Sequence, residues 1–368
     1  MSDEKPRKLP LLHRFTIALV VALVTGEIVA RVVDARAGRT LDFYLGGDPQ
    51  REMFELHPFI GYVPRPETDR HGNIEAGGQW IHQNALGMRG PEIPIEKPPG
   101  VYRIFCLGGS TTFGSGASRD ETTYPKRLEH YLNEQAPPGV TYEVDNCGVN
   151  GYSTVENLIY LELRLVEYHP DAIVIYQAAN DARSIQARGF RPDYTHMRRA
   201  WTDTQLVPFD EFMVRHVRLY AWATRGIDPE EQVGNLNNPL FVPNFKDLHQ
   251  PSDQGVPEEG IDVFFRNLEH MIWIARGHGI QPVLSTFAMC REKKKPNDED
   301  FLETVRVINE RMEPFAEEQG VPVLHIAEAL DGHCELFDDW MHMDDAGCDL
   351  HGRTAAEEAR RLGLFGLE

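Results

Sequence analysis

The sequence predicts an α/β protein: a three-layer α/β/α sandwich in which helices cover both faces of a five-stranded parallel sheet. From Tyr102 onward, short apolar segments of strand length alternate with longer amphipathic segments of helical period. Parallel strands are buried on both faces and are joined by crossover helices, so this alternation indicates a parallel sheet. Apolar residues make up 41% of the 368 residues, which is enough to form a packed interior.

The elements of this sandwich are expected in a regular order. Strands are expected at residues 102–107, 142–146, 172–177, 282–287 and 322–326. Helices are expected at residues 124–134, 154–167, 261–277, 298–319 and 354–362. An insertion at residues 182–260 interrupts the order and contains one expected helix, at 210–224. Long connections are usually functional lids or flexible additions, and this one leaves the carboxyl edge of the third strand, where open α/β sheets bind ligands.

The N-terminus has the character of a membrane anchor. Basic residues at positions 5, 7, 8 and 14 precede an apolar run from Phe15 to Val33 that only Glu27 and Arg31 interrupt. As a helix this run is about 28 Å long, which matches the hydrocarbon core of a bilayer. The basic flank predicts a cytoplasmic N-terminus and a periplasmic main domain. Glu27 is then expected near the outer interface or against a partner.

A cleaved signal peptide is the alternative to an anchor. Ala35-Arg36-Ala37 has the small-x-small form of a cleavage site, although it lies well beyond the most apolar part of the run. Cleavage there yields a secreted protein, whereas an uncleaved helix gives a single-pass membrane protein. The expected organisation is an anchor at residues 1–33, a lead-in of short strands and loops at 34–100, and the α/β domain at 101–368.

Charge and cysteine content exclude several classes of partner. The formal net charge of −20 excludes nucleic acid, because a polyanion is repelled before specific contacts form. The five cysteines show no CxxC pair and no spacing typical of zinc ligands. Cys106 and Cys147 belong to expected strand segments and are interpreted as small buried apolar residues. Cys334 and Cys348 are the expected disulfide in an oxidising compartment, and no cofactor is expected.

The first strand ends in a glycine turn followed by a serine, within the sequence RIFCLGGSTTFGSG. Gly108 and Gly109 permit a tight turn, and Ser110 then stands where a strand gives way to a helix, with its hydroxyl above the sheet edge. Its backbone N–H points into the same space, where a helix start favours developing negative charge. Ser110 is therefore a candidate nucleophile. A helix N-cap is the alternative, and a phosphate loop is disfavoured because the G-K-[ST] ending is missing.

The next two strands also end in groups that donate hydrogen bonds. In NCGVNGYST, Gly151 allows a backbone N–H to approach a ligand closely. In IVIYQAANDARS, the side-chain amide of Asn180 follows the apolar run directly. Taken one at a time, each is explained by an ordinary turn. Together with Ser110 they put three polar strand ends at one edge of the sheet.

A carboxylate and a histidine lie three residues apart near the C-terminus, in FDDWMHMDDAGCDLHG. Asp339 can accept the Nδ1–H of His342 and leave Nε2 facing a nucleophile, which is the base that a hydroxyl of high pKa requires. A metal site is the alternative, drawn from residues whose order matches no established ligand spacing. Those residues are His342, Asp344, Asp345, Asp349 and His351.

These four motifs, in this order, resemble the blocks of the SGNH/GDSL hydrolases over about residues 102–362. The lead-in ending HQNALGMRG and the apolar N-terminus look like those of membrane-anchored bacterial members. The resemblance implies a flavodoxin-like fold, with Ser110 as the nucleophile and Asp339 with His342 as its acid–base pair. It also implies an oxyanion hole formed by the N–H of Ser110, the N–H of Gly151 and the side chain of Asn180.

The sequence departs from the family pattern at two points. The usual Gly-Asp-Ser-Leu reads Gly-Gly-Ser-Thr, with Gly109 in the place of the aspartate. The usual Gly-x-Asn-Asp reads Ala178-Ala179-Asn180-Asp181. Both changes spare the groups that do the chemistry, but the loss of a supporting carboxylate at position 109 puts the orientation of the oxyanion loop in question.

The predicted function is a serine hydrolase that cleaves carboxylic esters, either acyl esters or O-acetyl groups, through an acyl-enzyme at Ser110. Its substrate is expected to be a small-molecule or glycan-linked ester. One alternative is an O-acetyltransferase or a deacetylase that acts on an extracytoplasmic glycan. Asp69-Arg70-His71 superficially resembles an Asp-x-His of related acetyltransferases and is interpreted as a loop coincidence.

A second alternative is a non-catalytic binding or assembly protein that keeps the fold. One helical face of the insertion suits such a role, because apolar and aromatic residues recur on it at helical spacing. The face is formed by Phe212, His216, Leu219, Tyr220 and Ala223.

Overall fold

The computed structural model describes residues 10–37, 53–57, 59–72, 74, 78–197, 207–225, 255–294 and 298–367. Its contacts divide the chain into two units. The N-terminal unit comprises residues 1–51 and 199–243, and the main unit comprises residues 52–198 and 244–368. The insertion therefore contributes to both units, and its residues 198–206 and 226–254 lie outside the described residues.

The main unit is built on a five-stranded parallel sheet, as predicted. The strands are β5 (Val101–Gly108), β6 (Thr141–Asn146), β7 (Ala172–Tyr176), β8 (Gln281–Ser285) and β9 (Val323–Leu324), in the order β6-β5-β7-β8-β9. Each neighbouring pair runs parallel. All five residues of β7 and the last six of β5 are buried, so these two adjacent strands lie in the core between the helical layers.

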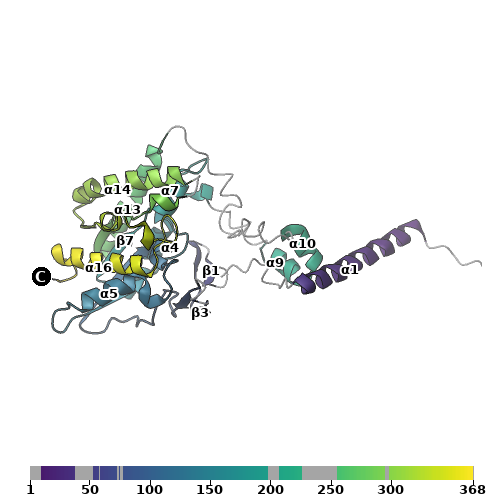
Figure 1. Cartoon of the computed structure of the whole chain (residues 1–368), viewed down its shortest axis with the longest axis horizontal. Helices are drawn as coiled ribbons and strands as arrows, with labels where there is room; N and C mark the ends of the chain where they lie inside the picture. Colours follow the sequence, from purple (N-terminus) through teal and green to yellow (C-terminus); the bar gives the residue numbers. More distant parts are fainter. Residues whose placement is uncertain are drawn as a thin grey trace, which may run out of the picture. The chain divides into compact units, whose positions relative to one another are not determined.

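Helices cover both faces of this sheet. One face carries α5 (Tyr124–Asn133) and α16 (Asp345–Arg361), and the other carries α6 (Thr154–Leu163), α13 (Glu258–Gly277) and α14 (Glu299–Gln319). Figure 1 shows α5 and α16 on one side of β7, and α13 and α14 on the other. The three-layer α/β/α sandwich is thus confirmed. Shorter helical elements are α4 (Ser110–Phe113), α7 (Ala179–Ile185), α15 (Ile326–Leu330) and 3₁₀ turns at Asp120–Thr122, Leu165–Tyr168, Thr195–Met197, Arg291–Lys293 and Cys334–Leu336.

Three boundaries differ from the prediction. The helix α16 begins at Asp345 instead of residue 354, because its first turns are buried through small residues that give no apolar period. There α16 packs closely on α5: a Cβ on Gly352 would lie 2.5 Å from the Cβ of Arg127. The last strand is short because α15 already begins at Ile326. The helix expected at 154–167 divides into α6 and a 3₁₀ turn.

The lead-in forms two antiparallel hairpins, β1 (Phe54–His57) with β2 (Gly61–Pro64) and β3 (Thr68–His71) with β4 (Trp80–Gln83). Arg89 then forms isolated bridges with Gln83 and with Asn146, the last residue of β6. The described part of the lead-in from residue 53 onward is therefore a part of the main unit.

The N-terminal unit contains α1 (Leu11–Ala37), the one helix among the described residues that is long and apolar enough to cross a membrane. The insertion adds α9 (Val207–His216) and α10 (Arg218–Arg225), and α10 contacts α1. The prediction of one helix at 210–224 is wrong, because the helix breaks at Val217. On both sides of the break, backbone groups bond to side chains of α1.

Candidate active site

The candidate nucleophile stands at the carboxyl edge of the sheet, at the turn between β5 and α4. The strand ends at Gly108, and Ser110 is the first residue of the helix. The half-buried Ser110 has its Oγ 2.7 Å from Nε2 of His342. The two residues are 232 positions apart in the sequence, so the fold alone brings them together.

A loop before α16 carries the other two predicted residues. Nδ1 of His342 lies 2.8 Å from Oδ2 of Asp339, and Oδ1 of the same carboxylate accepts the backbone N–H groups of Met341 and His342, each at 2.9 Å. Partial burial acts to raise the pKa of Asp339, but the hydrogen bond and charge of His342 and the two N–H groups hold it well below its usual range. Asp339 is therefore a carboxylate at neutral pH, suited to accept the Nδ1–H and direct Nε2 toward Ser110.

The loop that carries Asp339 and His342, residues 337–343, is called the acid–base loop below. Its base is closed by an antiparallel bridge between Phe337 and Met343. The N–H of Asp338 also donates to the carbonyl of His342, at 2.7 Å. The ammonium group of Lys293 donates to the carbonyl of Phe337. The loop is therefore held by its own backbone bonds and by this contact from Lys293, which lies outside it.

A disulfide ties this loop to the chain after β8. It joins Cys290 to Cys334, in the 3₁₀ turn just before the loop, and the N–H of Cys290 donates to the carbonyl of Trp340 at 2.8 Å. The predicted pair of Cys334 with Cys348 is wrong, because Cys348 is buried on α16 as a free thiol. The pairing partner is 44 residues away in the sequence and adjacent only in the folded chain. The other free cysteines, both buried as expected, are Cys106 and Cys147.

The opposite side of the site is formed by the chain that follows β6 and β7. The side-chain amide of Asn180 donates to the carbonyl of Tyr152 at 2.8 Å, which holds Asn180 against the turn at Gly151. Gly151 has a φ of +81°, a conformation that strains any residue with a side chain. A Cβ on Gly109 would lie 2.5 Å from Nδ2 of Asn180 and 3.2 Å from the Tyr152 carbonyl. Asn180 and the Gly151 turn therefore adjoin the turn that presents Ser110.

A buried carboxylate supports this arrangement. The carboxylate of Asp181 accepts three kinds of hydrogen bond: from the backbone N–H of Thr154 at 3.1 Å, from the hydroxyl of Thr154 at 2.6 Å, and from the side-chain amide of Gln177 at 2.7 Å. The same amide donates to the carbonyl of Tyr152 at 3.0 Å, so this carbonyl is held by both Gln177 and Asn180. Burial raises the pKa of Asp181 to about 6, against the hydrogen bonds from Thr154 and Gln177. Sequence reasoning named Asp181 only as a neighbour of Asn180 and missed its supporting role.

The profile of the GDSL-like Lipase/Acylhydrolase family matches residues 106–351, more than half of the chain. The chain belongs to this family. Membership supports hydrolase activity in general terms. A search of curated proteins finds no match to the chain.

Solved structures of similar fold come from several bacteria. A member of the lipolytic protein G-D-S-L family from Veillonella parvula DSM 2008 is 15% identical, with a TM-score of 0.40, over 71% of this chain and 97% of that one. The lipase/acylhydrolase from Enterococcus faecalis is 16% identical, with a TM-score of 0.40, over 70% of this chain and 94% of that one. A GDSL-like lipase from Bacteroides thetaiotaomicron VPI-5482 is 12% identical, with a TM-score of 0.39, over 71% and 89%.

In this GDSL-like hydrolase, the departure at Gly109 has a structural explanation. The amide of Asn180 and the carbonyl of Tyr152 occupy the space into which a side chain at position 109 would extend. On the same side of the site, the amide of Gln177 bonds to the Tyr152 carbonyl and to the buried Asp181.

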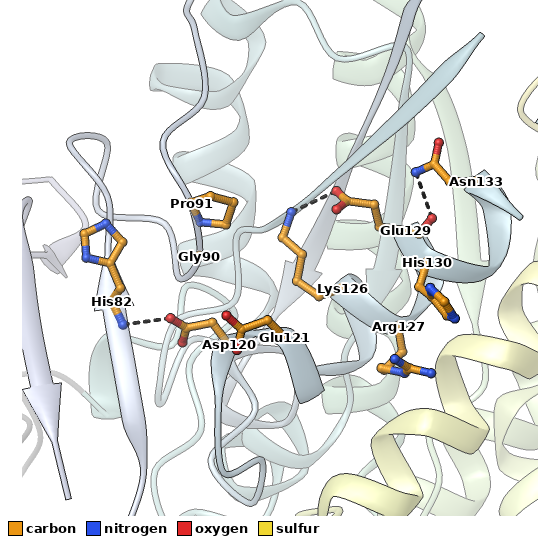
Figure 2. A pocket seen from close by; sticks show the side chains of 10 residues that line it. All are labelled: His82, Gly90, Pro91, Asp120, Glu121, Lys126, Arg127, Glu129, His130 and Asn133. Carbon is orange, nitrogen blue, oxygen red and sulfur yellow. Dashed lines mark hydrogen bonds and ion pairs between the residues drawn. The ribbon is translucent and has the colours of Figure 1, made fainter.

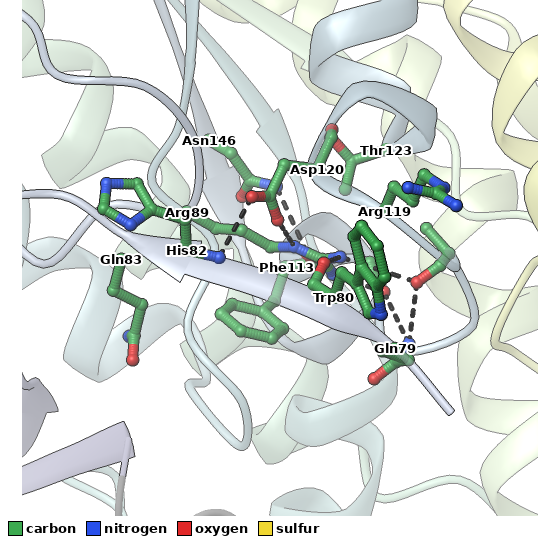
Figure 3. A network of polar contacts seen from close by, with 12 residues as sticks. Gln79, Trp80, His82, Gln83, Arg89, Phe113, Arg119, Asp120, Thr123 and Asn146 are labelled. Atoms are coloured by element: carbon green, nitrogen blue, oxygen red, sulfur yellow. Dashed lines mark hydrogen bonds and ion pairs between the residues drawn. The ribbon is translucent and has the colours of Figure 1, made fainter. Parts of the chain in front are cut away.

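A buried arginine of the lead-in holds the chain that follows the candidate nucleophile. Nη1 of Arg89 donates to the carbonyls of Phe113 at 3.0 Å and Gly114 at 2.7 Å, and Nε pairs with Asp120 at 2.7 Å. Figure 3 shows the Arg89 side chain between Asp120 and the ring of Phe113. The carboxylate of Asp120 also accepts a hydrogen bond from the backbone N–H of His82, at 3.0 Å. The HQNALGMRG segment is therefore a part of the scaffold that supports Ser110, since Phe113 and Gly114 end the nucleophile's helix.

The residues considered as a metal site have other contacts. Asp344 caps the start of α16, and Asp345 accepts hydrogen bonds from the chain that follows the nucleophile's helix. Asp349 forms an ion pair with α5, and His351 stacks on an aromatic ring at 3.8 Å between centroids. Across the described ranges, no group of three or more His, Cys, Asp or Glu side chains is arranged to hold a metal ion.

A cavity of about 520 Å³ lies beside α5 and includes none of the triad residues in its lining (Figure 2). Several of its charged groups are engaged with protein partners, such as Lys126 with Glu129 at 2.8 Å. Asp69-Arg70-His71 lies nearby on the strand β3 and not in the expected loop, and Oδ1 of Asp69 is 2.7 Å from Nδ1 of His82, which lines the cavity. Asp69 is thus engaged with a residue outside the triad.

Proposed function

We propose that this chain is a serine hydrolase that cleaves carboxylic esters, acyl esters or O-acetyl groups, through an acyl-enzyme on Ser110. One observation carries the proposal: the chain of contacts from Ser110 Oγ to His342 Nε2 at 2.7 Å, and from His342 Nδ1 to Asp339 Oδ2 at 2.8 Å. A serine hydroxyl needs such a base, and an imidazolium that forms next to it needs such a carboxylate.

The reaction proceeds in two steps. His342 takes the proton of Ser110 as Oγ attacks the ester carbonyl carbon, and it then gives this proton to the departing alcohol oxygen. The acyl group is left on Oγ. His342 next removes a proton from water, whose oxygen attacks the acyl carbon, and returns the proton to Oγ as the acid leaves. Asp339 stabilises the imidazolium in both steps, and its low pKa keeps it ionised for this role.

The oxyanion that forms in each step is proposed to be bound by the N–H groups of Ser110 and Gly151 and by Nδ2 of Asn180. A side-chain amide has two hydrogens, and the Asn180 amide uses one for the carbonyl of Tyr152. The other is then left for the substrate oxygen. Preorganised donors of this kind contribute the largest share of catalysis in many enzymes.

The proposed location is outside the cytoplasm, with α1 as an uncleaved anchor in the inner membrane and the main unit in the periplasm. The helix α1 has 27 residues, about 40 Å of length, which exceeds the hydrocarbon thickness of a bilayer. The disulfide between Cys290 and Cys334 supports an oxidising compartment, because disulfides persist there and are rare in the cytoplasm.

The direct test replaces the nucleophile. We expect Ser110→Ala to lose labelling by a fluorophosphonate probe and to lower turnover of short-chain nitrophenyl esters by about 10³-fold or more. The matched control is Thr141→Ala, which removes an exposed hydroxyl at the opposite end of the sheet, where β6 begins. Labelling of Ser110→Ala at the wild-type level contradicts the proposal. A panel of acetyl to long acyl esters and acetylated sugars, with sugar offered as a competing acceptor, then defines the substrate and separates hydrolysis from acyl transfer.

A further inference from the structure

Three charged residues in the C-terminal half of α1 are bonded to the helix pair α9–α10, residues 207–225. The carboxylate of Glu27 accepts the N–H groups of Arg218 at 2.9 Å and Leu219 at 2.8 Å, where α10 begins. Arg31 pairs with Glu27 at 2.7 Å and donates to the carbonyl of His216 at 2.8 Å, where α9 ends. A negative charge thus meets the positive end of one helix, and a positive charge meets the negative end of the other.

The same helix pair also reaches the outer end of α1. Asp34 accepts the indole N–H of Trp222 at 3.0 Å and lies 3.1 Å from Nε of Arg218. Asp34 is seven residues beyond Glu27, which corresponds to about 10 Å along a helix. Small residues permit this close packing: a Cβ on Gly26 would lie 3.3 Å from Leu219, and Ala30 is buried. The helix α10 therefore lies along α1 over the last part of its apolar run.

The position of Glu27 fixes the depth of these contacts. An anchor that spans a bilayer with residues 15–33 has Glu27 roughly 10 Å inside its outer end. Backbone and charged groups at that depth need protein partners, because lipid chains offer no hydrogen bonds. The start of α10 supplies these partners for Glu27, so α9–α10 belongs at the level of the outer lipid interface.

Large apolar side chains are exposed on this unit. Phe209 and Phe212, one turn apart on α9, are 65% and 56% exposed. On α1 itself, Ile28 and Val32 remain exposed beside the packed face. Large exposed apolar groups next to a membrane helix are typical of residues that enter the lipid interface. The partly buried Trp222, with its N–H bonded, is a residue type that the headgroup region favours.

We propose that α9–α10 is a membrane-surface element that binds the outer leaflet beside α1, with Phe209 and Phe212 inserted among the lipid chains. The proposal rests on the anchor function proposed for α1 and is independent of the esterase chemistry. The chain leaves the main unit after α7, passes through this element and returns to α13. The insertion therefore gives the main unit a second chain connection to the membrane, and this part of it is an anchor element and not an active-site lid.

The test places a fluorescent label at the proposed contact. The full-length chain carrying Phe209→Cys or Phe212→Cys is labelled with a nitrobenzoxadiazole group and reconstituted in phosphatidylcholine–phosphatidylglycerol vesicles. The unmodified chain is the blank, because its three free cysteines are buried. The matched control is Leu163→Cys, a large apolar residue on α6 that is 53% exposed in the main unit.

We expect doxyl-labelled lipids to quench the fluorescence of the labels at 209 and 212. Iodide in the buffer should quench these labels with a Stern–Volmer constant roughly fivefold smaller than that of the label at 163, because the bilayer excludes the anion. Iodide quenching at 209 and 212 equal to that at 163 overturns the proposal. Protection from both quenchers also overturns it, since the phenylalanines then contact protein, either a second copy or another part of the chain. Flotation of the vesicles in alkaline carbonate separately reports whether α1 is inserted, so failure of the anchor is distinguishable from failure of the α9–α10 contact.

Discussion

The two sides of the candidate active site are held in place by different means. On the oxyanion side, Asn180 is positioned by buried hydrogen bonds that lead through Tyr152 and Gln177 to Asp181, which is fully buried. On the acid–base side, Asp339 is 41% exposed in its side chain. Its loop is held by backbone bonds, by buried apolar side chains such as Trp340, and by the disulfide that precedes it. The first side is therefore held by buried polar contacts, whereas the second is held by buried apolar side chains, backbone bonds and a disulfide next to the loop.

This contrast makes distinct predictions for the two sides. Changes on the oxyanion side are expected to lower turnover strongly, because they alter groups that are proposed to stabilise the transition state. Changes to the attachment of the acid–base loop are expected to lower stability more than turnover, because the contacts of Asp339 with His342 are made within the loop itself.

The largest effect on turnover after loss of the nucleophile is expected at Asn180. Asn180→Ala should lower kcat by about 10²–10³-fold, since loss of one oxyanion donor costs about 3–4 kcal/mol of transition-state stabilisation. Asn180→Asp keeps the shape of the side chain and removes the donor, so it should lose a similar amount. Steady-state kinetics with an ester substrate, together with thermal unfolding of each variant, provide the check. Wild-type kcat in both variants contradicts the oxyanion function of Asn180.

The next effect tests the covalent attachment of the acid–base loop. Cys290→Ser, Cys334→Ser and the double variant should each lower the free energy of unfolding by about 2–4 kcal/mol, as expected for loss of a disulfide that closes a long loop. Urea unfolding with and without reductant measures this. Reductant should destabilise the wild type to the same extent and leave the double variant unchanged. A wild type that resists reductant, or variants that match it in stability, would argue against the Cys290–Cys334 link.

A smaller effect on turnover is expected at the turn before the nucleophile. Gly109→Ala should lower kcat by about 10-fold or more, because its Cβ must displace the Asn180 amide or the Tyr152 carbonyl from positions that serve the oxyanion. Gly277→Ala is the matched control, since its Cβ would meet no atom within 4 Å. The kcat values of the two variants, measured on one ester, are compared directly. If they agree, position 109 has no influence on the oxyanion side.

The effect that is smallest at neutral pH concerns a buried polar group that has no hydrogen-bond network. His351 is buried on α16, and its ring nitrogens lack hydrogen-bond partners among the described residues. Burial lowers the pKa of His351 from its ordinary 6.5 to about 3. Between these values the unfolded chain binds a proton that the folded chain does not, so stability falls as the pH falls through this window, by on the order of 1 kcal/mol per pH unit.

Replacing His351 should remove its contribution to the fall of the free energy of unfolding at low pH. For His351→Leu we expect the free energy of unfolding to decline less steeply than in the wild type between pH 6.5 and pH 3. The slope of urea-derived stability against pH is the measurement, so a change in absolute stability from repacking does not affect the comparison. Parallel slopes for the two proteins would show that His351 is solvated or charged in the folded state.

Much of the fold was predictable because its signals are local. Buried strands such as β7 are runs of apolar residues, and α13 and α14 have a clear helical period. The start of α16 escaped prediction because the buried residues of its first turns are glycine, cysteine and a histidine, which give no clear apolar period. The break at Val217 escaped because its cause is outside the helix, in the side chains of Glu27 and Arg31.

The sequence by itself determined the α/β class, the family motifs and the candidates Ser110, Gly151, Asn180, Asp339 and His342, because each stands at the end of a recognisable element or within a short spacing. Tertiary structure alone decided how they are supported. Arg89 bonds to the chain after Ser110, Asp181 bonds to Thr154, and Cys290 pairs with Cys334, in each case across a long stretch of sequence. Burial, which shifts the pKa of groups such as Asp181, is also a property of the folded chain. Ser110 and His342 meet across 232 residues for the same reason.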